Sequence, residues 1–493
     1  MTRASIHTGG IVFGSGDDLH SPKALPTDDA GMPLHILLMA DLGGTGSRRE
    51  TPLSERKILE INRDNFEQRF SALNVALDLP NEDESLGFAE FDHLHPDYLY
   101  TNTALFKQLR ALKQQLANPA TFNTALQQLT GEDTPVAPAL FDQLLAGAQS
   151  GDSHDLLDQV RDPDALIRSI VSPFIEPAED PRAAPLVASV EQASQQALRK
   201  LMHRGGFKRL EANWRALDFL CRNIQSSAQL KLFVLDISEA ELREQFNRSN
   251  DITETEIYRR TVAEPSQPGG VPYSVLLSDI TLQDRVEDIR VAAGLSALAV
   301  YSDGIALISG SERIAGCESL STTPDPRDWT HQSDAEFLQL WSVLRAEPQA
   351  ESLLIAAPRF LLRLPYGAKT APLEYLAFEE LDHQAPHENY LWSPGAYLAA
   401  LLIANTFEQN YWDFSDRVLN QVNDLPLHIR PDEDGDPIAQ AVAEIYMTDT
   451  TASALINAGL CPLRSVKNEA AVRVPQLVSA ASPATPVLAA ISA

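Results

Sequence analysis

The sequence of 493 residues contains only three cysteines, Cys221, Cys317 and Cys461, and they lie far apart. We therefore expect neither a disulfide framework nor the paired spacing of a zinc site, and the scarcity fits a reducing compartment. No apolar run approaches the roughly 20 residues that a membrane helix needs. The first residues also lack the apolar segment of a signal peptide. The sequence thus predicts a cytoplasmic protein without membrane insertion.

Positive charge is scarce as well. The sequence contains 39 lysines and arginines but 68 aspartates and glutamates, which gives a formal net charge of −29. Such a surface repels phosphate backbones, so we expect no nucleic-acid partner. Solubility alone is one explanation of the acidity, and a large acidic face kept for a basic partner is the other. The length allows two to four domains, and 44% hydrophobic residues are enough for more than one core.

Motifs that could carry chemistry are incomplete. The strand-like run 33–41 leads into Leu-Gly-Gly-Thr-Gly, but no Gly-Lys-Ser/Thr follows, so a phosphate-binding loop is not expected. His93 and His95 have a spacing at which two imidazoles can share a metal ion, yet no matching ligand cluster follows downstream. A second pair, His383 and His387, is interrupted by a proline that a regular helix does not accommodate. We therefore predict no catalytic site, no metal and no cofactor.

Hydrophobic patterns predict alternating strands and helices along most of the chain. Buried-strand patterns occupy residues 33–41, 229–237, 272–279 and 305–309. Helical patterns occupy residues 101–116, 186–202, 207–221, 286–300 and 395–411. Ser238 and Glu241 form a capping-box pattern at the start of a further helix. This alternation is typical of an α/β fold with mainly parallel strands.

Residues 353–392 form the stretch around which the rest is best understood. From Leu353 the sequence reads Leu-Leu-Ile-Ala-Ala-Pro-Arg-Phe-Leu-Leu-Arg-Leu-Pro-Tyr-Gly. Apolar runs divided by Pro-Arg and closed by Pro-Tyr-Gly predict a buried strand that enters a rigid turn holding Arg359 and Arg363. Arginines so close to apolar runs need partners. The nearest candidates are Glu374, Glu379 and Glu380.

The segment Pro-Arg-Phe-Leu-Leu-Arg-Leu-Pro-Tyr-Gly, followed by Phe-Glu-Glu and Tyr-Leu-Trp, closely resembles the large sheath subunit (TssC, or VipB) of bacterial type VI secretion systems. Leu-Glu-x-x-Trp-Arg-x-Leu, from Leu210, is similar to another segment of that family. These matches suggest structural or interface roles for eight residues. They are Arg359, Arg363, Tyr366, Glu379, Glu380, Trp392, Trp214 and Arg215.

Residues 33–129 instead resemble the small sheath subunit (TssB, or VipA). The core strand of that family ends in Asp-Leu-Ser-Gly, where this chain has Asp-Leu-Gly-Gly from Asp41. The segments Pro-Leu-x-x-Arg-Lys from Pro52 and Ile-x-Arg-Asp-Asn-Phe from Ile61 are also similar. No large-subunit pattern is recognisable after Leu463. The chain thus resembles a fusion of a small subunit with a C-terminally truncated large subunit.

The resemblance implies a contractile tail-sheath-like α/β fold, with mixed sheets flanked by helices in two packed domains. We expect an N-terminal arm (1–32), a small-subunit-like domain (33–131), a proline-rich helical linker (132–186), a large-subunit-like domain (187–464) and a flexible tail (465–493). The alternating run 4–13 in the arm is either a strand that pairs with another subunit or a disordered tail.

In the family, subunits stack around the Hcp tube, and contraction drives effector delivery. The resemblance therefore implies a structural, non-enzymatic protein of the bacterial cytoplasm. Its implied partners are other sheath subunits, the Hcp tube, the baseplate and a ClpV-type AAA+ ATPase. A second hypothesis is a sheath-end cap or adaptor that does not polymerise alone, because the strands linking neighbours are not recognised after Leu463. A third is a metal-dependent hydrolase at His93 and His95.

Overall fold

The computed structural model describes residues 7–8, 11–12, 31–44, 51–78, 85–118, 120–122, 124–126, 183–249, 251–381, 387–414, 418–431 and 434–491. Its centre is a seven-stranded sheet in the order β16-β10-β9-β8-β3-β7-β4. The strands are β3 (Leu34–Ala40), β4 (Leu59–Ile61), β7 (Leu230–Asp236), β8 (Val275–Leu282), β9 (Ile305–Gly310), β10 (Leu353–Ala357) and β16 (Cys461–Pro462). All neighbours are parallel except β4, which runs antiparallel to β7. The predicted α/β class is confirmed.

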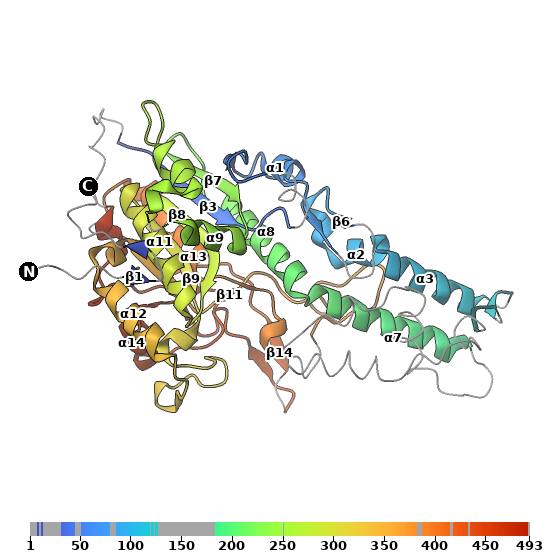
Figure 1. Cartoon of the computed structure of the whole chain (residues 1–493). Coiled ribbons are helices and arrows are strands. Elements are labelled where there is room, and N and C mark those ends of the chain that lie inside the picture. The colour runs from blue at the N-terminus through green and yellow to red at the C-terminus, as the bar shows by residue number, and fades with distance from the viewer. Residues whose placement is uncertain are drawn as a thin grey trace, which may run out of the picture.

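Helices cover both faces of this sheet (Figure 1). One face packs against α8 (Gly205–Asn223) and α13 (Ala396–Asn410). The other packs against helices α9 (Glu239–Arg248), α11 (Val286–Tyr301), α12 (Ala335–Ala346) and α14 (Asp449–Asn457). Successive side chains of a strand point to opposite faces, so each buried strand contributes to both cores. The predicted capping box of Ser238 and Glu241 is present at the start of α9.

Strand β3 joins the two halves of the sequence. It comes from the small-subunit-like segment, yet it lies between β7 and β8, which come from the large-subunit-like segment. Leu38, for example, lies opposite Val234 on one side and Leu277 on the other. All seven residues of β3 are buried. The boundary expected in the sequence therefore does not divide the sheet, because the two segments build it together.

A pair of helices projects from the body as an arm (Figure 1). Helix α3 (Ala104–Ala117) packs along α7 (Ala183–Met202), and Lys113 forms an ion pair with Glu191 at 3.1 Å. The buried face of α3 places Phe106, Leu109, Leu112 and Leu116 in the core, with Leu105 partly buried against it. Residues 183–186 of the expected linker belong to α7, and residues 132–182 lie outside the described ranges.

The expectation of a flexible tail after residue 464 is corrected. Strand β18 (Val472–Arg473) pairs with β13 (Gln421–Val422) and with β17 (Arg464–Ser465). Further on, the backbone N–H of Ala480 donates to the carbonyl of Leu353 at 2.7 Å, along the part of β10 that β16 does not reach. Apolar side chains scattered among the small and polar residues are buried in the core, so this segment is held by packing.

The described part of the N-terminal arm forms a short hairpin, and pairing of the arm with another subunit stays a prediction. Strand β1 (His7–Thr8) pairs antiparallel with β2 (Ile11–Val12), so the described part of the run 4–13 pairs within the chain.

The remaining short elements are α1 (Phe66–Ala72), β5 (Ala76–Leu77), β6 (Leu86–Gly87), η2 (Phe91–Leu94), α2 (Pro96–Asn102), η5 (Ile252–Glu254), α10 (Glu256–Tyr258), η6 (Arg259–Ala263), η7 (Glu312–Ala315), η8 (Pro326–Asp328), η9 (Pro348–Ser352), β11 (Phe360–Leu361), η10 (His387–Asn389), β12 (Trp392–Ser393), β14 (Ile429–Pro431), β15 (Pro437–Ala439) and η11 (Val487–Ala490). None of the described helices combines the length and the apolar character needed to cross a bilayer.

Candidate functional site

Arg363 lies just after β11, and its guanidinium binds two buried glutamates. Nε donates to Glu211 Oε1 at 2.7 Å, and the two terminal nitrogens donate to the two carboxylate oxygens of Glu380 at 2.6 and 2.9 Å. Glu211 comes from α8, whereas Glu380 follows Arg363 in the same loop. Both carboxylates are almost fully shielded from solvent. The planar guanidinium suits such paired contacts, in which two donors meet two acceptors.

Two further side chains complete this arrangement. Arg215, one turn after Glu211 on α8, donates to Glu211 Oε1 at 2.7 Å and to the Tyr366 hydroxyl at 2.9 Å. The backbone N–H of Tyr366 donates to Glu380 at 2.8 Å, and its ring centroid lies 4.3 Å from the Arg363 guanidinium carbon. We call these five residues the Arg363 cluster. Its two arginines and two glutamates balance in charge.

The electrostatics of the Arg363 cluster keep its members ionised. Burial alone would raise the pKa of Glu380, but the charge and hydrogen bonds of Arg363, together with His203, lower it to about 2. Burial likewise opposes ionisation of Glu211, and Arg363 and Arg215 outweigh it, so that its pKa is lowered. A general acid or base works best with a pKa near the operating pH. The cluster therefore fastens α8 to the loop 363–380 and is poorly suited to proton transfer.

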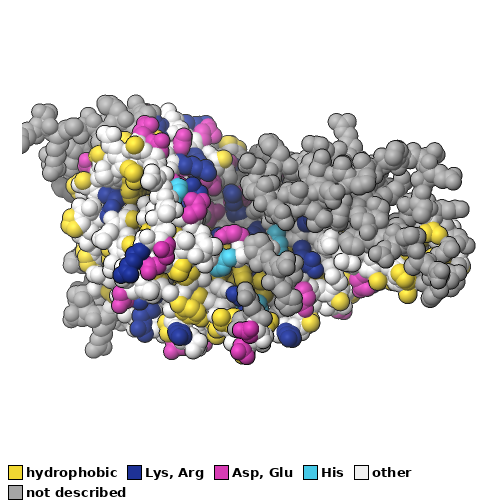
Figure 2. Space-filling model, turned by 90° about the horizontal axis from the view of Figure 1, so that it is seen from below, with side chains coloured by type: hydrophobic (Ala, Val, Ile, Leu, Met, Phe, Trp, Pro, Cys, Tyr) yellow, Lys and Arg dark blue, Asp and Glu magenta, His cyan; other side chains and the backbone are white. Residues whose placement is uncertain are grey.

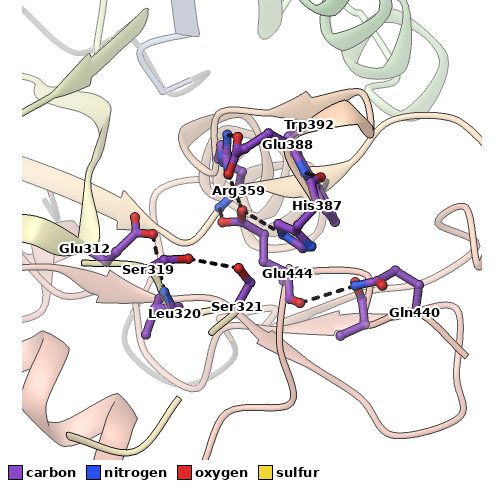
Figure 3. A network of polar contacts seen from close by, with 12 residues as sticks. Glu312, Ser319, Leu320, Ser321, Arg359, His387, Glu388, Trp392, Gln440 and Glu444 are labelled. Atoms are coloured by element: carbon purple, nitrogen blue, oxygen red, sulfur yellow. Dashed lines mark hydrogen bonds and ion pairs between the residues drawn. The ribbon is translucent and has the colours of Figure 1, made fainter. Parts of the chain in front are cut away.

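Arg359, four residues earlier, binds a different pair of glutamates (Figure 3). Its terminal nitrogens donate to Glu388 at 2.8 and 2.9 Å, and its backbone N–H donates to Glu444 Oε2 at 2.9 Å. His387 Nε2 lies 3.2 Å from Glu444 Oε1, and the Trp392 indole donates to the His387 carbonyl at 2.9 Å. Burial would raise the pKa of Glu444, but Arg359 and His387 lower it to about 2. We call these residues the Arg359 cluster.

Trp214 on α8 connects the large-subunit-like segment to the small-subunit-like one. Its indole N–H donates at 2.7 Å to the carbonyl of Leu42, two residues after the end of β3. Its ring packs against Phe70 and Phe66, with centroid distances of 4.4 and 5.6 Å. This contact closes the end of β3 against α8, as expected for a core tryptophan with a satisfied N–H.

In the glycine-containing turn after β3, backbone N–H groups donate hydrogen bonds to a carboxylate of the same chain. The N–H groups of Leu42 and Gly43 donate to Asp236 Oδ1 at 2.8 and 2.9 Å. Gly44 has a φ of +62°, and a Cβ placed there would lie 2.2 Å from the Ala76 carbonyl oxygen. The glycines therefore serve a tight turn and a close backbone approach.

The sequence identified the arginines but only one of their partners. Of the three candidate glutamates, only Glu380 binds Arg363. Glu379 accepts the N–H of Ala368 at 3.0 Å, and the backbone of Glu374 donates to Asp97 at 3.1 Å. The missed partners Glu211, Glu388 and Glu444 lie 152, 29 and 85 residues from their arginines. Only Glu211 had a signal in the sequence, because it precedes Arg215 by four residues, the spacing of an ion pair on a helix.

The histidines that suggested a metal site have other contacts. His93 Nδ1 accepts the N–H of Ala89, and His95 Nδ1 accepts the N–H of Asp97. The ring of His93 stacks on Tyr98 with centroids 4.0 Å apart. In the ranges that the structure describes, no three His, Cys, Asp or Glu side chains come together in a way that could hold a metal ion. His383 lies outside those ranges, and His387 belongs to the Arg359 cluster.

A cleft of about 430 Å³ opens beside the Arg363 cluster. Its walls come from both segments, and they include Phe91, Asp92, His95, Arg215, Arg363, Leu364, Tyr366 and Ala371. The edge of the His95 ring faces Tyr366 at a centroid distance of 4.8 Å. The arginines of the wall are already paired with glutamates, so the cleft offers no excess positive charge for an anion.

Comparison with known proteins matches both segments. The profile of the VipB family, described as the EvpB tail sheath N-terminal domain, matches residues 184–479. The profile of the type VI secretion system protein VipA matches residues 26–137. The chain is similar to the type VI secretion system sheath protein TssC1 of Pseudomonas aeruginosa, at 29% identity over 289 residues, which are 57% of this chain and 58% of TssC1. It is also similar to the sheath protein TssB1 of that organism, at 29% identity over 126 residues, which are 24% of this chain and 72% of TssB1. The chain thus spans less than two thirds of the length of TssC1.

Proposed function

The chain belongs to the VipB family of tail sheath proteins and carries a VipA-like segment ahead of it, and we propose that it is a structural component of the contractile sheath of a type VI secretion system. The observation that carries this proposal is the position of β3. The VipA-like segment supplies this strand to the middle of a sheet whose other neighbours come from the VipB-like segment. In this chain the pair acts as one covalently linked building block.

The buried ion clusters suit a mechanical role. Each one ties together segments that are distant in the sequence. Glu211, Glu380 and Glu444 are nearly closed to solvent, whereas the Glu388 side chain is 62% exposed. Paired charges of this kind lose much of their favourable energy when their geometry is disturbed, so they favour one arrangement of the segments over others. A subunit that transmits force to its neighbours benefits from such fixed geometry.

The proposed partners follow from the family. Further sheath proteins or further copies of this chain would be the lateral and axial neighbours, and an Hcp tube would lie inside the assembly. The baseplate and a ClpV-type AAA+ ATPase would be partners at assembly and disassembly. The protein would work in the bacterial cytoplasm without enzymatic activity, and contraction of the sheath would drive effector delivery.

The test is assembly of the full-length chain. Purified protein, alone and co-expressed with Hcp, is examined by sedimentation and by negative-stain electron microscopy. Material that sediments as large particles and appears as regular tubes or stacked rings is the expected result. A protein that remains monomeric in both preparations and at every concentration would contradict the proposal. Zinc bound in stoichiometric amount, and lost when His93→Ala and His95→Ala are combined, would contradict the absence of enzymatic metal chemistry.

A further inference from the structure

The last part of the chain that the structure describes carries no charge. Residues 477–491, which we call the edge strap, contain only apolar side chains and the hydroxyls of serine and threonine. On the face drawn in Figure 2, by contrast, acidic and basic side chains are interspersed with apolar ones. An uncharged segment rich in alanine and valine gains free energy when it leaves water. The composition of the strap therefore suits contact with the core of the protein.

The edge strap crosses the edge of the central sheet at β10. Strand β16 pairs with residues 356–357 of β10 and does not reach Leu353. There the backbone N–H of Ala480 donates to the carbonyl of Leu353 at 2.7 Å. Ala480 is buried in the core that contains residues of α11, whereas Val487 is buried in the core that contains residues of α13. The strap thus passes around the sheet edge and contributes to both cores.

The edge strap is held together by its own hydrogen bonds. The backbone N–H of Ser479 donates to the carbonyl of Thr485 at 2.8 Å, and their two hydroxyls also lie 2.8 Å apart. The N–H of Val487 donates to the carbonyl of Leu477 at 2.9 Å. These bonds lie inside the strap, so they do not depend on its contacts with the rest of the protein. The strap is therefore a preformed loop rather than a loose end.

Arg345, on α12, fastens the edge strap to the rest of the protein. Its Nε donates to the carbonyl of Ala480 at 2.8 Å, and one terminal nitrogen donates to the carbonyl of Ala481 at 3.4 Å. The other terminal nitrogen donates at 2.8 Å to the carbonyl of Asn457, the last residue of α14. Carbonyls at the C-terminus of a helix attract a cation. Burial lowers the pKa of Arg345, whose guanidinium joins the strap to α14 through carbonyl oxygens.

A glycine makes room for this arginine. Gly459 follows α14 and has a φ of +93°. Glycine adopts this backbone conformation without steric cost. A Cβ placed at Gly459 would lie 2.8 Å from Arg345 Nε. Any larger residue there would push the guanidinium away from the carbonyls that it binds.

We propose that the edge strap is a removable cap, latched by Arg345, that closes the β10 edge of the central sheet against a further strand. An uncovered edge strand presents N–H and C=O groups with which an extended segment of another chain can pair. The strap occupies this edge first, because its covalent tether gives it a high effective concentration. The VipB profile ends at residue 479, so the strap carbonyls bound by Arg345 lie beyond the family match. The cap is an autoinhibitory contact, and it does not depend on whether the chain forms a sheath.

Hydrogen exchange of the full-length chain, followed by mass spectrometry, tests the latch. Arg345→Met keeps an unbranched apolar side chain and removes the donors. Loss of hydrogen bonds from a charged group should speed exchange in residues 477–491 at least about tenfold. Exchange in β3 should stay unchanged. The control is Arg248→Met, which removes an arginine that is 62% exposed and paired with Glu244, and it should leave exchange in the strap unchanged.

Unchanged exchange in the strap of Arg345→Met would overturn the latch, and so would a wild-type strap that exchanges as fast as an unstructured peptide. If Arg345→Met also speeds exchange in β3, the variant is destabilised as a whole, and Ala480→Pro decides instead. This second change removes the N–H that donates to Leu353 and leaves Arg345 in place. It should speed exchange in the strap and not in β3, and an unchanged strap would overturn the cap.

A peptide added in trans tests whether the edge accepts a strand once the strap is weakened. A fluorescein-labelled synthetic peptide of residues 474–491 is titrated against the full-length chain and followed by fluorescence anisotropy. It should bind the Ala480→Pro chain at least about tenfold more tightly than the wild type, whose own strap competes for the edge. The same peptide carrying Ala480→Pro lacks the donor and should not bind.

Equal affinity of the peptide for both chains, or equal affinity of both peptides for the Ala480→Pro chain, would overturn the cap. Tube formation, which decides the sheath proposal, is measured separately. Tubes without peptide binding would leave the sheath proposal standing and the cap refuted, whereas peptide binding without tubes would do the reverse.

Discussion

Replacement of Arg363 by methionine tests whether the Arg363 cluster holds the fold together. Methionine preserves much of the side-chain volume and removes the charge. The change leaves Glu380 without its main counter-charge and leaves Glu211 with Arg215 alone. Removing one partner of a buried ion pair costs about 3–5 kcal/mol, because the remaining charge stays buried without compensation. We expect the free energy of unfolding to fall by an amount in this range at pH 7.

The pH dependence of the variant gives a second, independent signature. In the wild type, the pKa of Glu380 falls from its ordinary 4.5 to about 2 on folding. Its contribution to stability is therefore complete above about pH 4.5 and is lost as the pH falls toward 2. Without Arg363, burial dominates and raises this pKa above its unfolded value. The folded variant then binds more protons than the unfolded chain, so its stability should rise as the pH falls from 7 to 5.

Urea unfolding at pH 7 and pH 5, followed by tryptophan fluorescence, measures both effects. Arg222→Met is the control for an exposed ion pair, because Arg222 on α8 pairs with Asp218 four residues away but has a side chain that is 65% exposed. Its loss should cost about 0.5 kcal/mol or less. A loss below about 1 kcal/mol for Arg363→Met would refute the reasoning, since surface pairs have that magnitude. A variant whose stability changes between pH 7 and pH 5 by the same amount as that of the wild type would also refute it.

Three further outcomes are expected from the same unfolding assay. Gly44→Ala should lower the free energy of unfolding by about 1–3 kcal/mol, because Gly44 has a positive φ and a Cβ there would meet a backbone carbonyl. Gly87→Ala is the control: a Cβ at Gly87 meets no atom, so the free energy of unfolding should change little. Trp214→Phe should cost about 1–3 kcal/mol, because a buried carbonyl loses its donor; an unchanged stability would show that water replaces the indole. Glu444→Gln should destabilise by about 3 kcal/mol, and the more exposed Glu388→Gln should cost clearly less; equal losses would contradict the buried position of Glu444.

The strands and helices were largely predictable because their patterns are local. The buried-strand pattern at 33–41 corresponds to β3, and the helical pattern at 395–411 corresponds to α13. The resemblance to small and large sheath subunits is confirmed by the matches at 26–137 and 184–479. These sequence patterns remain recognisable between distantly related proteins, because burial restricts the residue types that a core strand or helix accepts.

The partners of the arginines and the order of the C-terminal segment were not predictable in the same way. Nearness in the sequence favoured Glu374 and Glu379, but Arg363 pairs with Glu211 from a helix 152 residues away. The segment after 464 has a composition of Ala, Ser, Pro and Val that is common in tails. Its order comes from long-range contacts such as the hydrogen bond from Ala480 to Leu353.

The sequence by itself determined the α/β class, the family, and the two arginines that needed buried partners. The tertiary structure alone decided that the two segments share one sheet, because strand order is set by which edges meet in space. It also decided which carboxylates pair with Arg359 and Arg363. Ion pairing requires that two charged groups lie within a few ångströms of each other. The sequence contains many acidic residues, and only the folded structure shows which of them lie that close to each arginine.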